Sequence, residues 1–213
     1  DKKNYKDTFG ALYARVSTLV PYTGNVDNNS AANKRGNVID LLIRDFFAST
    51  QELTTQERFN DKAQKYIKEQ NGLQAGDVLK MDDTFLETLM TIFKYYAVVF
   101  NELEYTVYSD VPPVAFKMND TLYAGTVDLL IYDNKNKVWK IIDLKTASSD
   151  RQDLYDRTNK HGYKKKDVVQ QNAYLEGFRQ TAKVDINSLE ILPITSQPNA
   201  LRGKALKKAK EEG

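Results

Sequence analysis

The sequence predicts an α/β (α+β mixed) fold, in which helices flank a central mixed β-sheet and the N-terminal half is helical. Apolar residues recur at helical spacing before about Glu104 and alternate as in strands after it. Helices followed by a hairpin, another helix and another strand are typical of a sheet covered by helices. The 213 residues suit a single domain, with a mainly helical part (1–103), a sheet with its helix (104–195) and a basic tail (196–213).

Three helices are predicted in the N-terminal part. The first runs from Arg35 to Ser49, where apolar side chains form a stripe at helical spacing. The second begins at the capping box Thr54-x-x-Glu57 and ends near Gln70, and the third begins at Thr84-x-x-Glu87. We expect these helices to pack against the sheet.

Alternating segments predict three strands, from Tyr105 to Ser109 or beyond, from Leu122 to Tyr132 and from Lys137 to Thr146. The polar run Asp133 to Lys137 is a turn, so the last two strands should form an antiparallel hairpin. The remaining expected elements are a helix from Asp167 to Ala182, a strand from Leu189 to Ile194 and an exposed helix from Lys204 to Lys210.

Composition excludes several kinds of site. The chain has no cysteine and only one histidine, His161, which excludes disulfides, thiolate metal sites, thiol nucleophiles and sites with two imidazoles. The net charge is only +2, so a nucleic-acid site has to be a local patch. No segment has the apolar length of a membrane span or a secretory signal, which predicts a cytoplasmic protein without membrane contact.

Charged residues on the hairpin are the strongest candidates for a functional site. Asp143 and Lys145 lie two apart on a strand and therefore share a face. A two-residue loop (135–136) and a four-residue loop (134–137) give the same register, in which the numbers of paired residues sum to 271. Asp128 then lies opposite Asp143, with β-carbons about 5 Å apart.

Two opposed carboxylates repel each other unless a cation lies between them. Oxygen ligands without cysteine or histidine favour Mg²⁺ or Mn²⁺. An Asp-x-Lys strand is usually a solvated edge or a surface ion pair, and in a metal-free scaffold the aspartates would face apart and pair with lysines across the sheet. The apolar neighbours Ile141, Ile142 and Leu144 favour the metal site.

These motifs resemble the PD-(D/E)XK nuclease superfamily, in particular its RecB-like and phage lambda-type exonuclease branch. The core motifs are Gly125-Thr126-Val127-Asp128 and Ile141-Ile142-Asp143-Leu144-Lys145-Thr146, and Gln170-Gln171-Asn172-Ala173-Tyr174 matches the Gln-x-x-x-Tyr element of the branch. Ser17-Thr18-Leu19 and Arg35-Gly36-Asn37-Val38-Ile39-Asp40 resemble its opening segment. There the branch has Gly-x-x-x-His or Gly-x-x-x-Glu, and this chain has Asp40.

The resemblance implies a restriction-endonuclease-like core and a DNA-hydrolysing enzyme that uses Mg²⁺ or Mn²⁺. By similarity, Asp128, Asp143, the backbone carbonyl of Leu144 and Asp40 would bind the metal. Lys145 would orient or activate the attacking water, and Gln170 and Tyr174 would position the substrate backbone or brace the lysine.

The substrate and the partners follow from the same resemblance. We expect single- or double-stranded DNA, in the cytoplasm of a bacterium or a phage-infected host. Some resembling exonucleases form rings, so a homo-oligomer or a partner recombination protein is a further alternative. A lysine cluster between the catalytic strand and the next helix is a candidate phosphate guide, although such a run is usually a solvated surface: Lys160, Lys164, Lys165 and Lys166.

A second interpretation belongs to another class of protein. The chain would then be a non-catalytic nucleic-acid-binding or assembly module that retains the nuclease fold. Asp40 favours this alternative, because its side chain is shorter than the histidine or glutamate of the resembling branch.

Overall fold

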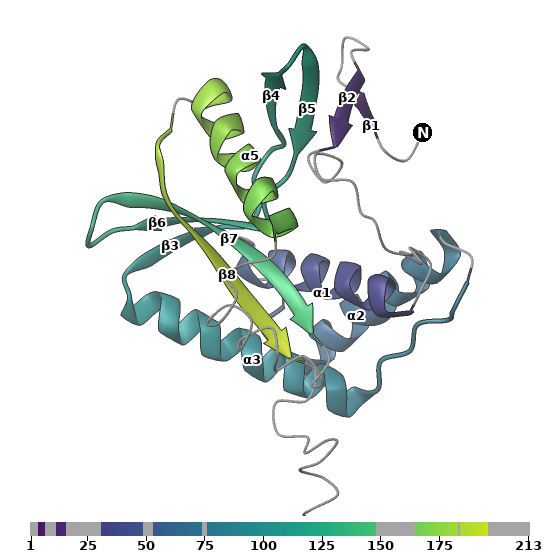
Figure 1. The fold of residues 1–213 in the computed structure, drawn as a ribbon. Helices are drawn as coiled ribbons and strands as arrows, with labels where there is room; N and C mark the ends of the chain where they lie inside the picture. Colours follow the sequence, from purple (N-terminus) through teal and green to yellow (C-terminus); the bar gives the residue numbers. More distant parts are fainter. Residues whose placement is uncertain are drawn as a thin grey trace, which may run out of the picture.

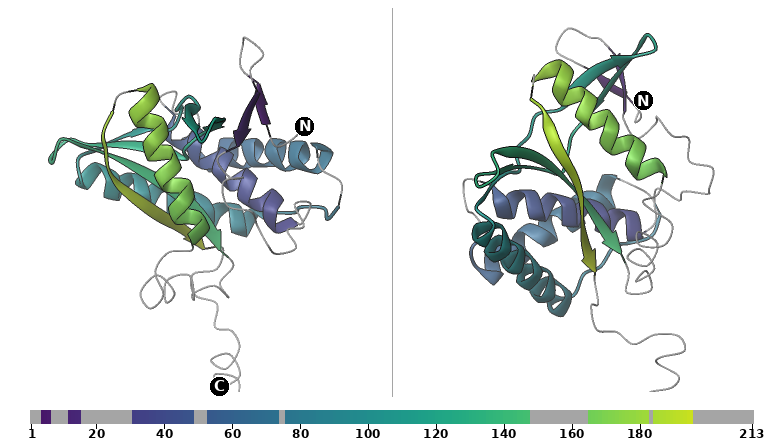
Figure 2. Two further views of the ribbon diagram at one scale, coloured as in Figure 1. Left: turned by 45° about the horizontal axis from the view of Figure 1, so that its top comes forward. Right: turned by 60° about the vertical axis from the view of Figure 1, so that its left-hand side comes forward.

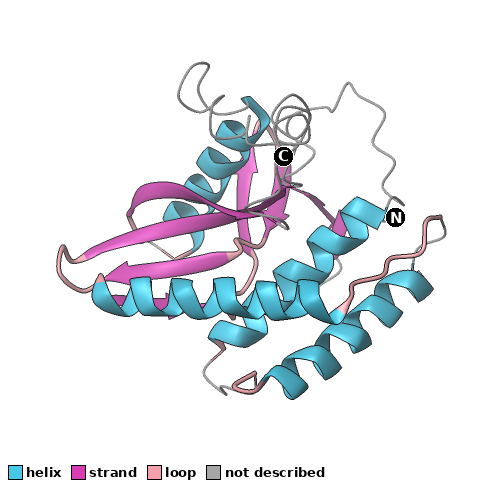
Figure 3. Ribbon diagram, turned by 90° about the horizontal axis from the view of Figure 1, so that it is seen from below, coloured by secondary structure: helices cyan, strands magenta, loops and turns pink. Residues whose placement is uncertain are grey.

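The protein is built from two sheets and four helices in the part of the chain that the computed structural model describes, which comprises residues 4–6, 12–15, 31–48, 53–73, 76–147, 165–182 and 184–195. Helices α1, α2 and α3 lie on one side of the larger sheet, and α5 lies on the other side (Figure 1). Figure 3 shows this layering from the α3 side. The expected mixed α/β class is confirmed.

The four helices lie close to their predicted ranges. They are α1 (Ala31–Phe47), α2 (Gln56–Leu73), α3 (Asp83–Glu102) and α5 (Lys165–Thr181). The predicted capping residues are wrong by one or two positions. Thr55 caps α2 by accepting a hydrogen bond from the Arg58 N–H, and Asp82 caps α3 by accepting one from the Phe85 N–H. A carboxylate at the start of α3 also interacts favourably with the helix dipole.

The strands form two four-stranded sheets. One has the order β1 (Asn4–Lys6), β2 (Leu12–Arg15), β5 (Thr121–Gly125), β4 (Val114–Met118). The other has the order β3 (Tyr105–Tyr108), β6 (Leu129–Asp133), β7 (Val138–Ala147), β8 (Ile186–Thr195). Figure 2 shows the smaller sheet beside α5 and the larger one beneath it. Two of the strands, β1 and β2, lie in the part that we predicted to be mainly helical.

The predicted strand from Leu122 to Tyr132 is wrong, because the chain divides there into β5 and β6, which belong to different sheets. Alternation continues through the break, since Val127 is buried, so the sequence pattern hides it. Strand β4 was not predicted. It forms a hairpin with β5 through Asn119-Asp120, and both of these residues have positive φ, as a two-residue hairpin turn requires.

The register of the β6–β7 hairpin is confirmed. Leu129 pairs with Ile142 and Asp133 with Val138, so paired numbers sum to 271, and the loop is the four-residue alternative, 134–137. Lys137 closes this loop with a positive φ of 58°. Strands β7 and β8 are parallel, and α5 lies between them in sequence, as parallel neighbours require a long crossover.

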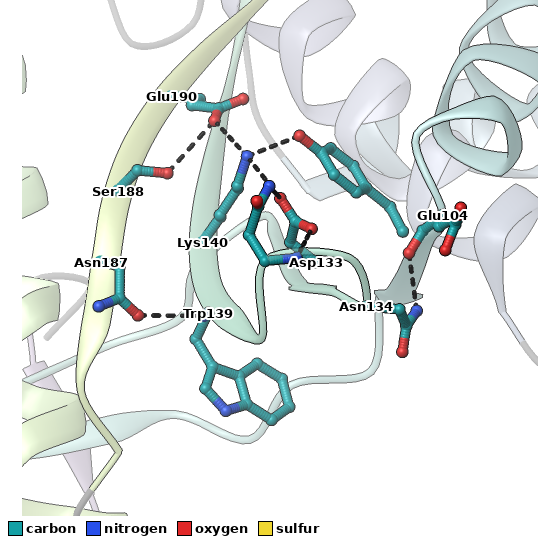
Figure 4. Close-up of polar contacts among 10 residues, drawn as sticks. Glu104, Asp133, Asn134, Trp139, Lys140, Asn187, Ser188 and Glu190 are labelled. Atoms are coloured by element: carbon teal, nitrogen blue, oxygen red, sulfur yellow. Dashed lines mark hydrogen bonds and ion pairs between the residues drawn. The ribbon is translucent and has the colours of Figure 1, made fainter.

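An ion-pair network around the buried Asp133 joins this hairpin to its neighbours (Figure 4). The Lys140 Nζ lies 2.6 Å from the Tyr105 hydroxyl, 3.3 Å from Asp133 Oδ2 and 3.4 Å from Glu190 Oε1. Asp133 also accepts hydrogen bonds from the backbone and side-chain N–H groups of Asn136. The network therefore connects all four strands of the larger sheet.

Two hydrophobic clusters lie on opposite faces of the larger sheet. Ile142 and Leu144 pack with α1, α2 and α3, whereas Ile141 packs with α5. Asp143 and Lys145 alternate with Ile142 and Leu144, so they lie on the α5 face. None of the described helices is long and apolar enough to cross a membrane.

Candidate functional site

Asp143 and Lys145 form an ion pair within strand β7. The Lys145 Nζ lies 2.5 Å from Asp143 Oδ2, and the Asp143 residue is only 5% exposed. Both side chains point to the α5 face, because they are two residues apart. A buried carboxylate and its cation at this position differ from the solvated edge that an Asp-x-Lys strand usually forms.

Asp128 lies one residue before β6, in the break between the two sheets. Its Oδ2 accepts a hydrogen bond of 2.7 Å from the Leu144 N–H. The carboxylate is therefore bound to the backbone between Asp143 and Lys145. We predicted that Asp128 pairs with Asp143 across the hairpin. The pairing of β6 with β7 begins at Leu129, one residue after Asp128, so these two aspartates are not a pair of the ladder.

Leu144 presents a second backbone group to the same place. The N–H and C=O of a strand residue point toward the same neighbouring strand. Because the Leu144 N–H donates to Asp128, its carbonyl also faces the Asp128 side of β7. The predicted role of this carbonyl as a metal ligand stays a prediction.

Helix α1 brings Asp40 and Arg44 to the same site. The Arg44 Nε lies 3.3 Å from Asp40 Oδ1, and its Nη2 lies 3.3 Å from Asp128 Oδ1. One guanidinium thus bridges carboxylates that are 88 positions apart in sequence. Asp128 pairs with an arginine from a helix, whereas the metal-free alternative predicted a lysine across the sheet as its partner.

Arg44 is the site residue that sequence analysis missed. Its spacing of four from Asp40 is a signal, because oppositely charged residues at this spacing lie next to each other on a helix. That signal also fits an ordinary surface pair. Only the packing of α1 against the sheet shows that Arg44 reaches Asp128.

Burial and neighbouring negative charges raise the pKa of the carboxyl groups in this site. Burial and, after it, the charge of Asp40 raise the pKa of Asp128, and the Leu144 N–H, Arg44 and Lys145 oppose the rise; the net result is a pKa of about 6. Burial also raises the pKa of Asp40, and Asp143 contributes to that rise. Two cations therefore only partly offset the three carboxylates.

The described residues do not contain a group of three or more histidine, cysteine, aspartate or glutamate side chains arranged to hold a metal ion. The carboxylates of this site instead form ion pairs with basic side chains. Asp40 and Asp128 pair with Arg44, and Asp143 pairs with Lys145. The candidate metal ligands of this site are all oxygen atoms, which Mg²⁺ and Mn²⁺ prefer as ligands.

Gln170 and Tyr174 lie on α5, the helix that covers the Asp143 face. The Gln170 Nε2 donates a hydrogen bond of 3.1 Å to the Tyr174 hydroxyl. Tyr174 is buried in the same cluster as Ile141, the β7 residue two positions before Asp143. The predicted pair is therefore joined within the helix, on the side of the sheet to which Asp143 and Lys145 point.

Several predicted residues cannot be placed. Lys160, Lys164, His161 and Ser17-Thr18-Leu19 lie outside the described residues, as does the expected helix from Lys204 to Lys210. Lys165 and Lys166 belong to the first turn of α5, but the structure describes only their backbone. The expected lysine cluster therefore stays a prediction.

Comparisons with known proteins found no relative. The chain matches no family model, no curated protein and no solved structure. The resemblance to the nuclease superfamily therefore stays a prediction that rests on the quoted motifs.

Proposed function

We propose that this chain is a metal-dependent nuclease that hydrolyses the phosphodiester bonds of DNA. The observation that carries the proposal is the hydrogen bond from the Leu144 N–H to Asp128. It attaches the half-buried Asp128 carboxylate to the backbone between a second, buried carboxylate, Asp143, and its lysine, Lys145. Carboxylates that are close together and largely removed from water destabilise the fold unless a cation balances them, so their arrangement suits a site that binds a cation.

The donor set fits a hard divalent cation. Asp128, Asp143, the Leu144 carbonyl and Asp40 would supply oxygen atoms, and the contacts of one Arg44 guanidinium with both Asp40 and Asp128 support the proposal that these two carboxylates can share a cation. Mg²⁺ or Mn²⁺ bound there would lower the pKa of a coordinated water and withdraw charge from a phosphate oxygen. These four groups are the proposed ligands.

The protein's own residues would orient the reaction. The Lys145 side chain is 27% exposed, so its Nζ can donate a hydrogen bond to the attacking water or to the phosphate. Asp143 holds that ammonium group in position. In hydrolysis the water oxygen would bond to phosphorus and lose its proton to solvent, the bond to the leaving sugar oxygen would break and that oxygen would take up a proton from solvent, and the Lys145 Nζ would stabilise the added negative charge on the phosphate.

The Gln170–Tyr174 pair would act from α5. Its internal hydrogen bond fixes the orientation of both side chains. Gln170 is half-buried, whereas Tyr174 is buried in the core beneath the helix. We therefore propose that Gln170 contacts the substrate backbone and that Tyr174 braces Gln170.

Digestion of DNA with the purified protein tests the proposal. End-labelled linear, closed circular and single-stranded DNA are incubated with Mg²⁺ or Mn²⁺, beside the variants Lys145→Ala and Asp143→Ala. We expect metal-dependent loss of linear DNA, intact circles as for an exonuclease of the recombination, repair or phage type, and no cleavage by either variant. Cleaved circles would instead indicate an endonuclease, and full activity in a folded variant contradicts the assignment of the catalytic residues.

The second candidate is a non-catalytic nucleic-acid-binding or assembly module that keeps this fold. The observation that favours it is the absence, among the described side chains, of a group already arranged for a metal. A calorimetric titration with Mn²⁺ separates the two functions. The enzyme should show a metal site that disappears in Asp128→Ala, and the module should show none in the unaltered protein.

A further inference from the structure

We propose that Arg44 is a resident cation of this site, and that a divalent metal must displace it from Asp40 and Asp128 in order to bind. This inference rests on the proposed metal-dependent function. It assigns a positioning role to a residue outside the motifs, and it explains why the carboxylates are not arranged as a metal site while Arg44 holds two of them.

The geometry of Arg44 is that of a bridge. Its Nε donates a hydrogen bond to Asp40 and its Nη2 donates one to Asp128, so each carboxylate accepts from a different nitrogen of the same guanidinium. Neither is held by the paired, parallel hydrogen bonds that make an arginine–carboxylate contact strong. Both distances are 3.3 Å, longer than the 2.7–2.9 Å or so of a good charge-assisted bond. Such a bridge keeps the carboxylates ordered and can be opened.

The charges around the bridge favour an exchange of cations. Asp40, Asp128 and Asp143 carry three negative charges when ionised, and Arg44 and Lys145 carry two positive charges. These five groups therefore carry a net charge of −1 when all are ionised. A divalent ion supplies two positive charges at the shorter distance of an oxygen–metal bond, about 2.0–2.1 Å for Mg²⁺, so it interacts more strongly with the same oxygens.

The Arg44 side chain can also leave the carboxylates without unfolding its helix. It lies in the last turn of α1, and 24% of its side chain is exposed, so its head group can move toward solvent without unfolding the helix. A cation in the last turn is favourable by itself, because the free carbonyl groups give that end of a helix a partial negative charge. The released side chain therefore keeps part of its electrostatic stabilisation.

Metal affinity and metal-free stability test the proposal together. Mn²⁺ is titrated calorimetrically into the full chain and into Arg44→Gln, Arg44→Lys and the control Arg58→Gln, which replaces an exposed arginine on α2. Thermal unfolding is then measured without metal and in saturating Mn²⁺. We expect Arg44→Gln to bind Mn²⁺ about tenfold more tightly than the unaltered chain, which corresponds to about 1.4 kcal/mol.

The same variant should be less stable without metal, because the carboxylates lose a counter-charge, and should regain stability in Mn²⁺. Arg44→Lys keeps the charge but cannot bridge both carboxylates, so its Mn²⁺ affinity should lie between those of the unaltered chain and Arg44→Gln. Arg58→Gln should match the unaltered chain. If Arg44→Gln is unfolded without metal, Arg44→Lys alone decides the question.

The outcomes separate this inference from the proposed function. Equal or weaker Mn²⁺ binding in both Arg44 variants, with clear binding in the unaltered chain, overturns the role of Arg44 and leaves the nuclease proposal intact. No Mn²⁺ binding in any of the proteins overturns the metal-dependent function and this inference with it.

Discussion

At the scale of single residues, Asp128 shows how burial and charge oppose each other in the site. Its side chain is 20% exposed and contacts one guanidinium and one backbone N–H, yet burial still raises its pKa from an ordinary 3.8 to about 6. The folded protein therefore binds a proton at Asp128 more tightly than the unfolded chain does. Above pH 6 the ionised carboxylate destabilises the fold, and this loss disappears as the pH falls from 6 toward 4.

Replacing Asp128 by asparagine tests this effect. Asparagine can still accept the Leu144 N–H but carries no charge, so metal-free Asp128→Asn should be more stable than the unaltered chain at pH 7.5, by at most about 3 kcal/mol. The difference should shrink at pH 5, where the unaltered Asp128 is largely protonated. Thermal unfolding at several pH values measures it, and a stability difference that does not change with pH contradicts the explanation.

The same variant reports on the metal. Mn²⁺ should raise the melting temperature of the unaltered chain, because a ligand that binds only the folded state stabilises it. It should not raise that of Asp128→Asn, and the gain in the unaltered chain should fall below pH 6, where protons compete for Asp128. Removal of Mn²⁺ with a chelator should restore the original melting temperature.

At the scale of elements, the network around Lys140 holds the β6–β7 hairpin in register (Figure 4). The pKa of Asp133 falls to about 2, mainly because the Asn136 side chain and then its backbone N–H donate to the carboxylate. Lys140 is the cation nearest to this buried aspartate. It lies on the opposite face of β7 from Asp143, so the network is separate from the proposed catalytic residues.

Lys140→Met should therefore affect stability more than catalysis. It leaves the buried Asp133 without its cation and should destabilise the protein by roughly 1–3 kcal/mol. For a chain of this length, each kcal/mol lowers the melting temperature by about 2–4 °C. Glu190→Gln is the matched control, since Glu190 is 44% exposed and lies 3.4 Å from the same ammonium, and its effect should stay within about 0.5 kcal/mol. Equal losses in both variants would contradict this ranking of the contacts.

Helix α5 packs closely on β4 at Gly177. A β-carbon at this position would lie 2.8 Å from Val114 Cγ2 and 3.1 Å from Val114 Cβ. The same end of α5 is bonded to β4 through the Lys117 N–H, which donates to Gln180 Oε1, and the Thr181 hydroxyl, which donates to the Ala115 carbonyl. A side chain at 177 must therefore push the helix or Val114 aside.

Gly177→Ala should destabilise the protein by about 1–3 kcal/mol, as overpacking does. It should also lower the rate of DNA cleavage, because α5 carries Gln170 and Tyr174. Gly72→Ala in α2 is the control: its β-carbon would have no atom within 4 Å, and alanine in a helix should stabilise by about 0.5–1 kcal/mol. Thermal unfolding should move in opposite directions for the two variants, and a shift in the same direction argues against the close contact.

At the scale of the whole molecule, the break between β5 and β6 determines where the site lies. The chain leaves the smaller sheet at Gly125 and enters the larger one at Leu129. Asp128 ends this connection, where it reaches Arg44 of α1 on one side and the Leu144 N–H of β7 on the other. A continuous strand from Leu122 to Tyr132, as first predicted, keeps Asp128 within a single ladder and does not explain its contact with α1.

The sequence by itself determined the features that depend on neighbouring residues. Helical and alternating periodicity placed α1, α2, α3, α5 and β7 within a few residues, because each pattern reflects which face of one element is buried. The position and length of the turn predicted the β6–β7 register, because the loop of a hairpin fixes which residues pair across it. Spacings of two and four likewise placed Asp143 with Lys145 on one face of a strand and Gln170 with Tyr174 on one face of a helix. The ion pair and the hydrogen bond within these pairs come from the structure.

Only the tertiary structure decided the features that join distant segments. These are the division of one alternating run between two sheets, the parallel pairing of β2 with β5, and the bridge from Asp40 through Arg44 to Asp128. No local pattern encodes them, because they depend on how helix α1 packs against the sheet, and packing is a property of many side chains together. The acidic pair that the sequence indicated is therefore, in the folded protein, three carboxylates that share two cations.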